Sequence, residues 1–288
     1  MIKDSIFNTF NNREIVLIIY LLIFISWTLT QKKIRESIFN IIKVLTSRSI
    51  FLSIMALLLY VSLIIYGFYF FKFWDFSMLK DAVYWTFGVG FIMMMNSNEA
   101  IKEEHYFKKI LQDNFKLLLI LEFIVGLYVF GLITEFILMP FVIFFSLILA
   151  YTNTHKEYSQ VKNLLQIVLG IGGTGYLIYS GYMIYRDLNE FASYNTIKSF
   201  LFPILMTILF IPFAYFYALY MHYESLFVRL RFSLKDDRVL RKYAKKRILI
   251  LVNLSLSRLK RFSPGFIFIN CKSKDDIKMA IKEKLSTK

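Results

Sequence analysis

Long apolar segments constrain this chain more than any other feature of its sequence. The clearest is residues 116–151, which contains two acidic residues and no basic residue after its opening lysine. At 1.5 Å per residue, this stretch would form about 54 Å of helix, whereas the hydrocarbon core of a bilayer is about 30 Å thick. We therefore expect two membrane spans here, joined by a tight turn near Thr134 and Glu135.

Most of the chain shares this character. Of its 288 residues, 57% are hydrophobic, and they fall in blocks too long for an ordinary soluble domain. The sequence predicts an all-α polytopic membrane protein with about seven transmembrane helices and a small basic C-terminal cytosolic domain. We expect a membrane domain over residues 1–223 and a cytosolic domain over residues 224–288. The expected spans lie near residues 15–30, 50–71, 82–96, 117–133, 136–151, 164–185 and 200–221.

The distribution of lysine and arginine predicts the orientation. With the N-terminus outside, the three inner loops hold eleven basic residues and the short outer segments hold six. Residues 222–288 add 18 basic residues against six acidic ones. Because basic residues favour the cytoplasmic side, we expect an outer N-terminus and a cytoplasmic C-terminus. The composition, rich in Lys, Ile, Phe and Asn, is typical of AT-rich bacterial genomes and points to a bacterial inner (plasma) membrane.

Two segments leave structural alternatives open. The span at 82–96 is short and contains Gly88 and Gly90, so it either crosses the membrane, as we expect, or re-enters it. In the tail, "RILILVN" and "GFIFIN" have strand-like composition, but residues 236–262 also fit helices. Ser273 and Asp276 have the spacing of a capping box ahead of a final apolar helix face.

One inner loop, residues 31–49, has a helical apolar stripe between its basic residues. This pattern is typical of a helix that lies in the headgroup layer. The residues of the stripe are Ile34, Ile38, Ile41, Ile42 and Leu45.

Two carboxylates fall in the long apolar stretch. Glu135 is expected at the turn between two spans, where headgroup water would reach it. Glu122 is expected about 9 Å along the helix from Lys116, where an unpaired charge costs a few kcal/mol. We therefore predict Glu122 as the intramembrane polar or pore residue and interpret Glu135 as a turn residue.

The segment "GIGGTG" matches the spacing of a dinucleotide-binding loop. It lies inside an expected span, without the strand-to-helix context that the loop requires. Small residues in membrane helices instead allow close approach of a neighbouring helix or subunit. We predict such a packing face, with a flexible hinge as the alternative, at Gly170, Gly172, Gly173 and Gly175.

A dense basic cluster follows the last span. Attraction to anionic lipid explains such a cluster as well as binding of an anionic ligand does, such as a nucleotide or oligonucleotide. The candidate ligand-binding residues are Arg238, Arg241, Lys242, Lys245, Lys246, Arg247, Arg258 and Arg261.

No catalytic motif is visible. The sequence lacks a P-loop, an HExxH motif and a nucleophile–base spacing, so we predict that the protein is not an enzyme. Cys271 is the one cysteine and the three histidines lie in separate segments, so no metal site and no cofactor is expected.

The layout of short-looped spans followed by the basic segment 235–261 resembles membrane effectors of bacterial anti-phage systems, including the Hailong type. The resemblance is one of architecture and assigns no residue a role. It implies a homo-oligomeric channel or pore in the lipid bilayer that a nucleotide or nucleic-acid ligand controls. The alternative is a non-conducting scaffold or accessory subunit whose tail docks a cytosolic protein.

Overall fold

Helices make up almost the whole fold. A computed structural model shows 89% helix and, in the part of the chain that it describes, no strand. This confirms the all-helical class predicted from the sequence. The described residues are 10–102, 106–114, 117–234, 237–262, 268, 271 and 273–286.

Several helices are long and apolar enough to cross a membrane, as expected of a membrane protein. The described residues contain five of them, and all five coincide with predicted spans. They are α2 (Asn12–Thr30), α4 (Arg48–Phe70), α10 (Leu132–Thr154), α11 (Ser159–Arg186) and α13 (Tyr194–Ser233).

The other two predicted spans form shorter elements. Residues 117–133 contain α9 (Leu117–Leu127), which ends well before the predicted limit. Residues 82–96 are helical but change winding along their length. There α5 (Leu79–Trp85) leads into a π-helical segment, η2 (Thr86–Gly90), and then into α6 (Phe91–Met95). A Cβ added at Gly90 would lie 3.0 Å from the Trp85 ring, so this winding leaves room only for glycine without a shift of the ring.

The turn between the fourth and fifth predicted spans lies at residues 128–131, and the predicted position near Thr134 and Glu135 is wrong. Helix α10 begins directly after Gly131, so Glu135 lies in its first turn. A carboxylate is favourable there because it is close to the free N–H groups and positive dipole end of the helix.

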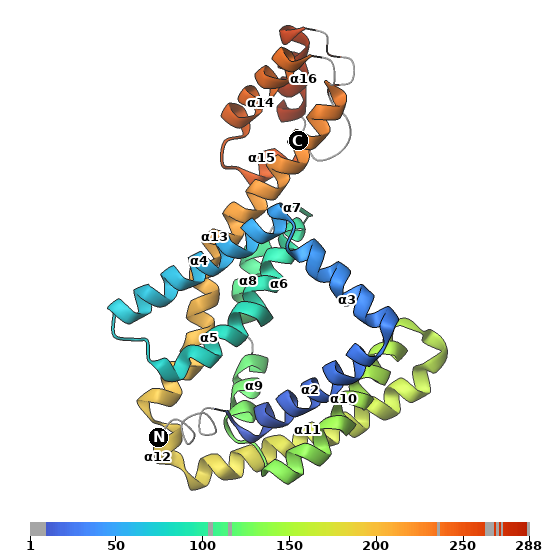
Figure 1. Ribbon diagram of the computed structural model, residues 1–288. Coiled ribbons are helices and arrows are strands. Elements are labelled where there is room, and N and C mark those ends of the chain that lie inside the picture. Colours follow the sequence, from blue (N-terminus) through green and yellow to red (C-terminus); the bar gives the residue numbers. More distant parts are fainter. Residues whose placement is uncertain are drawn as a thin grey trace. The chain divides into compact units, whose positions relative to one another are not determined.

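The chain divides into two compact units. The first comprises the described parts of Met1–Met55, Asp75–Lys80 and Phe115–Phe202. Within it, α10 packs against both α2 and α11, and α11 also packs against α9 (Figure 1). The amphipathic helix predicted at residues 31–49 is present as α3 (Lys32–Leu45), which has no buried residue. The short elements of this unit are η1 (Phe76–Met78), η4 (Lys156–Tyr158) and α12 (Leu188–Phe191).

The second unit comprises the described parts of Ala56–Trp74, Asp81–Asn114 and Pro203–Lys288. An aromatic cluster joins three of its helices. The Trp85 ring meets Phe210 edge-on at 5.2 Å, and its indole N–H donates to Thr207 Oγ1 at 3.0 Å. The Tyr60 hydroxyl donates to the Leu209 carbonyl at 3.1 Å. The remaining elements are η3 (Asn96–Asn98), α7 (Glu99–Lys102), α8 (Tyr106–Asn114), α14 (Arg238–Val252), α15 (Leu256–Lys260) and α16 (Lys274–Ser286).

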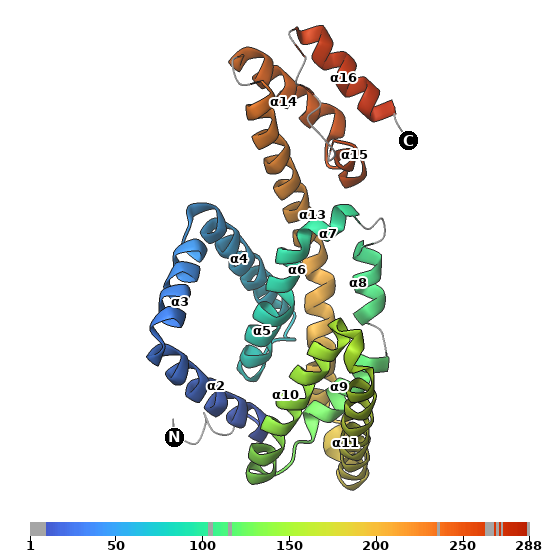
Figure 2. The same ribbon diagram turned by 90° about the vertical axis from the view of Figure 1, so that its right-hand side faces the viewer.

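The tail helices share a hydrophobic core with the C-terminal half of α13. Figure 2 shows α16 lying along α14, and α15 follows the turn at the end of α14. Tyr223 donates from its hydroxyl to the Asn253 carbonyl at 2.5 Å, and Tyr215 donates to the Leu254 carbonyl at 2.6 Å. These bonds hold the α14–α15 turn against α13. The residues buried in this core include Leu226, Leu230, Leu240, Ala244, Ile248, Val252, Leu259, Phe262, Ile277 and Ile281.

Of the two alternatives for the tail, the helical one is confirmed over residues 238–262. The run "RILILVN" belongs to α14, because residues four apart from Leu240 to Val252 form one buried stripe. The predicted capping box is also present: Asp276 N–H donates to Ser273 Oγ at 3.1 Å, and Ser273 N–H donates to Asp276 Oδ2 at 2.9 Å. Most of "GFIFIN" lies outside the described residues.

Candidate functional site

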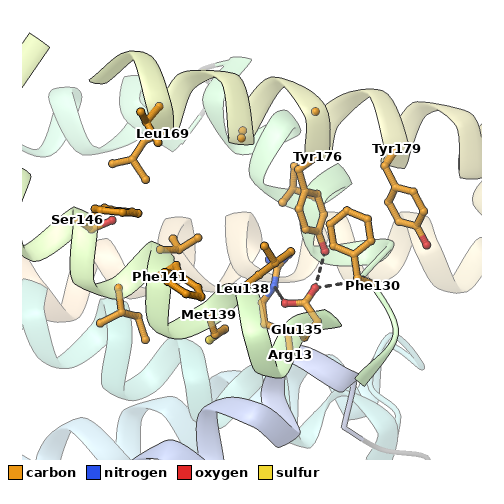
Figure 3. A pocket seen from close by; sticks show the side chains of 18 of the residues that line it. Arg13, Phe130, Glu135, Leu138, Met139, Phe141, Ser146, Leu169, Tyr176 and Tyr179 are labelled. Carbon is orange, nitrogen blue, oxygen red and sulfur yellow. Dashed lines mark hydrogen bonds and ion pairs between the residues drawn. The ribbon is translucent and has the colours of Figure 1, made fainter. Parts of the chain in front are cut away.

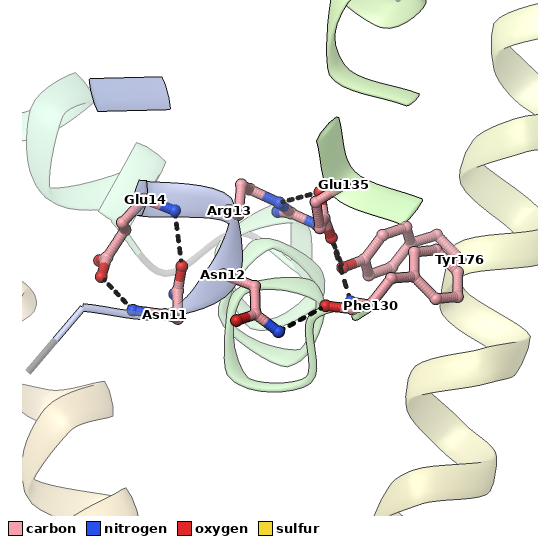
Figure 4. Close-up of polar contacts among 7 residues, drawn as sticks. All are labelled: Asn11, Asn12, Arg13, Glu14, Phe130, Glu135 and Tyr176. Carbon is pink, nitrogen blue, oxygen red and sulfur yellow. Dashed lines mark hydrogen bonds and ion pairs between the residues drawn. The ribbon is translucent and has the colours of Figure 1, made fainter. Parts of the chain in front are cut away.

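The first unit contains a buried carboxylate, Glu135, with partners on other segments. The side chain of Glu135 is 4% exposed and contacts three residues (Figure 4). The Tyr176 hydroxyl donates to Oε1 at 2.9 Å, and the Phe130 backbone N–H donates to the same oxygen at 3.1 Å. Arg13 Nε lies 3.5 Å from Oε2. The interpretation of Glu135 as a solvated turn residue is therefore wrong, because the carboxylate points inward and is paired.

The N-terminal end of α2 positions Arg13 for this contact. Asn11 and Glu14 form a capping box, with bonds of 2.9 and 2.7 Å between side chains and backbone N–H groups. Asn12 Nδ2 donates to the Phe130 carbonyl at 3.0 Å, which ties α2 to the 128–131 turn. The Arg13 guanidinium then lies 4.7 Å from the centre of the Tyr176 ring, so it has both a cation–π partner and a carboxylate.

Glu122, the intramembrane carboxylate predicted from the sequence, belongs to α9. Its side chain lies outside the described residues. Depth in an apolar stretch is the sequence feature that favours Glu122. Glu135 lies in the same stretch, but the predicted turn near Thr134 and Glu135 put it in headgroup water, whereas the turn lies at residues 128–131.

The Glu135 network lines one end of a pocket of about 1000 Å³ (Figure 3). Residues of α10 and α11 form most of the wall, and α2 contributes Arg13 and Leu17. The wall is otherwise mostly aliphatic and aromatic. The pocket therefore has one charged, hydrogen-bonding end and a long apolar interior.

The glycines of "GIGGTG" lie on α11. A Cβ added at Gly170, Gly172, Gly173 or Gly175 would meet no atom within 4 Å among the described residues. All but Gly170 line the pocket. The predicted role in packing against a second subunit stays a prediction.

The basic cluster of the tail lies on α14, which begins at a well-formed N-cap. Asp237 accepts hydrogen bonds from the N–H groups of Val239 and Leu240 at 2.7 and 2.8 Å. Of the six cations on this helix, three are exposed and three are half-buried. The exposed ones are Arg238, Lys242 and Lys246, and the half-buried ones are Arg241, Lys245 and Arg247.

Lys245 lies where α14 faces α13, within reach of the charges of Arg231 and Arg241. Burial lowers the pKa of the Lys245 ammonium below its usual value, and the charges of Arg231 and Arg241 lower this pKa further. In the described part of the chain, none of the three has a carboxylate partner. The Lys245 ammonium rests 4.8 Å from the centre of the Phe227 ring. The structure thus adds Arg231, near the end of α13, to the predicted set, because α14 packs back against α13.

The other predicted basic residues contact the protein itself. Arg247 donates from Nε to the Tyr243 hydroxyl at 3.3 Å. Arg258 donates to the Leu251 carbonyl at 3.2 Å, and Arg261 donates to the Leu285 carbonyl. Among these residues, Arg258 and Arg261 therefore help to hold the tail helices together.

Within the described residues, no three histidine, cysteine, aspartate or glutamate side chains gather in a way that would hold a metal ion. No family model, no curated protein and no solved structure matches this chain.

Proposed function

We propose that this protein is a homo-oligomeric membrane channel or pore-forming effector whose cytosolic tail senses an anionic nucleotide or oligonucleotide. The observation that supports it best is the group formed by Arg231, Arg241 and Lys245. Among the described residues no carboxylate pairs with these like charges, so their repulsion raises the free energy of the tail, and a multivalent phosphate would relieve that cost. Arginine adds selectivity because its planar guanidinium can bind two phosphate oxygens at once.

Helix α13 supports a route from this group to the membrane. In the second unit it runs without a break from Pro203 to Ser233. Its first part belongs to a candidate membrane span, and its last part supplies Arg231 and a wall of the tail core. Pro203 and Pro212 each remove one backbone hydrogen bond, so the apolar part of the helix is the place where bending costs least.

The proposal includes the finer topology. Seven spans, with α5–η2–α6 and α9 as the two short ones, leave the N-terminus outside and the basic tail in the cytoplasm. In this arrangement α3 lies in the inner headgroup layer. A role in anti-phage defence would follow from the resemblance in architecture.

Conductance of the purified full-length protein in planar bilayers tests this function. We expect ATP or a short single-stranded DNA of mixed sequence to change the current. The double variant Arg241→Gln/Lys245→Gln should raise the half-effective concentration about tenfold or more, because it removes two charge-assisted contacts. Its matched control, Lys278→Gln/Lys282→Gln on α16, removes the same charge and should shift that concentration less than about threefold.

Two results would contradict the proposal. Equal shifts in both variants would show a general attraction between the anion and the basic tail. A protein that inserts correctly and conducts no ions under any condition would favour the non-conducting scaffold, with the tail as a docking site for a cytosolic protein.

A further inference from the structure

We propose that the pocket between α10 and α11 binds an acyl chain of an anionic phospholipid, whose phosphate is held by Arg13. This inference concerns the first unit and does not depend on the channel function. It rests on the dimensions of the pocket, the chemistry of its two ends and the absence of side chains on one wall.

The length of the pocket matches one leaflet of a bilayer. Along α10 its lining runs from Glu135 to Ser146, and along α11 it runs from Val168 to Tyr179. Each stretch spans eleven residue steps, or about 16 Å of helix. Half of a hydrocarbon core that is about 30 Å thick is about 15 Å. An acyl chain that enters at the polar end would therefore reach the bottom of the pocket near the middle of the membrane.

The polar end lies where a headgroup would lie. Arg13 and Glu135 are both in the first turn of candidate membrane helices, α2 and α10. With the predicted orientation, this is the outer leaflet. Between this end and Ser146 the lining is mostly apolar, with residues such as Phe141, Val142 and Leu169. The change from charged to apolar along the helix axes is the same change that a phospholipid presents.

Arg13 has donors available for a phosphate. Its Nε faces Glu135, its ring-facing side stacks on Tyr176, and 26% of its side chain is exposed. Among the described residues, no hydrogen-bond partner is present for its two terminal NH2 groups. Glu135 holds the guanidinium in place from the buried side, and the exposed side keeps the fork that binds phosphate.

The glycine wall makes room for the chain. Gly172, Gly173 and Gly175 present backbone to the pocket, and an added Cβ at any of them would meet open space. A larger side chain would fit the protein but occupy the volume that the acyl chain needs. Gly170, on the same helix, also faces open space but does not line the pocket, so it offers a matched control.

Photo-cross-linking of the full-length protein in liposomes tests the site. The probe is phosphatidylglycerol with a diazirine on one acyl chain, and the labelled peptides are identified by mass spectrometry. We expect Gly173→Leu to reduce label on the pocket-lining peptides of α10 and α11 about tenfold, through overpacking of the site, while Gly170→Leu keeps it. Arg13→Gln should reduce the preference for this lipid over a phosphatidylcholine probe, and Arg13→Lys should retain part of it.

Equal labelling of the Gly173→Leu and Gly170→Leu proteins would overturn the proposal, because it would mean that lipid merely coats the surface. Loss of the oligomer in Gly173→Leu, together with unchanged labelling, would also overturn it and would assign the glycine face to subunit packing. Size-exclusion chromatography of the same samples separates these outcomes. Equal elution of both variants also shows that the loss of label is not caused by misfolding.

Discussion

Helices α10 and α11 of the first unit bury different kinds of residues from helix α14 of the tail. In the most apolar stretches of α10 and α11, only 6% of the residues are buried, and Glu135, Thr152 and Ser180 are among the buried residues of the two helices. In α14 the buried residues are all apolar, and half of its cations are exposed. The buried residues of α10 and α11 thus include a glutamate and two hydroxyl residues, whereas those of α14 are apolar throughout.

The two patterns of burial correspond to different stabilising interactions. In the tail, the apolar stripe of α14 is buried in a core shared with α13, α15 and α16, which is the arrangement that the hydrophobic effect stabilises in water. In a bilayer, lipid would solvate the apolar side chains of α10 and α11 as well as protein does, so burial of leucine there would contribute little. A polar group there must find partners within the protein. Glu135 does so through Arg13, Tyr176 and the Phe130 backbone.

The largest effect should come from the core of the tail. Ile248 is completely buried, so Ile248→Ala should lower the free energy of opening of α14 by about 2–4 kcal/mol. Leu147 on α10 is 65% exposed, and Leu147→Ala should change the stability of its helix by less than about 0.5 kcal/mol. Hydrogen exchange of the backbone amides in detergent measures both values. Equal losses of stability would show that apolar side chains stabilise α10 as much as α14.

An intermediate effect should come from the buried carboxylate. Glu135→Ala leaves Arg13 unpaired and the Phe130 N–H without its acceptor. We expect a loss of about 2–3 kcal/mol, toward the lower end for a broken buried pair because Arg13 is partly exposed. Titration with sodium dodecyl sulfate from a mild detergent, followed by circular dichroism, measures this loss. Glu157→Ala, at an exposed position, is the control and should leave the midpoint unchanged.

The smallest effect should come from the hydroxyl that supports Glu135. Tyr176→Phe removes one hydrogen bond and keeps the ring under Arg13, so a loss of about 1 kcal/mol is expected. Tyr182→Phe, at a position 58% exposed, should have no effect in the same titration. In the background of Glu135→Ala, Tyr176→Phe should cost nothing more, since its partner is already gone. Additive losses would place the tyrosine outside the network.

Local sequence was sufficient for the elements themselves. Long apolar helices at five of the predicted spans, the amphipathic helix at residues 31–49 and the capping box at Ser273 all appear in the structure. Each depends on hydrophobic length, on helical period or on the spacing of two neighbouring residues, which the sequence displays directly. For α14 in the tail, periodicity left strand and helix open, and the buried stripe of residues four apart from Leu240 to Val252 shows the helix.

Contacts between polar groups on different helices could be seen only in the folded structure. Arg13 and Tyr176 reach Glu135 from other helices, and Tyr176 lies 41 residues away in the sequence. Arg231 joins Arg241 and Lys245 because α14 folds back along α13. The period of a helix shows which face is apolar, but it does not show which helix lies beside it. That choice comes from packing over the whole unit, so the buried carboxylate and the cation group could be recognised only once the helices were in place.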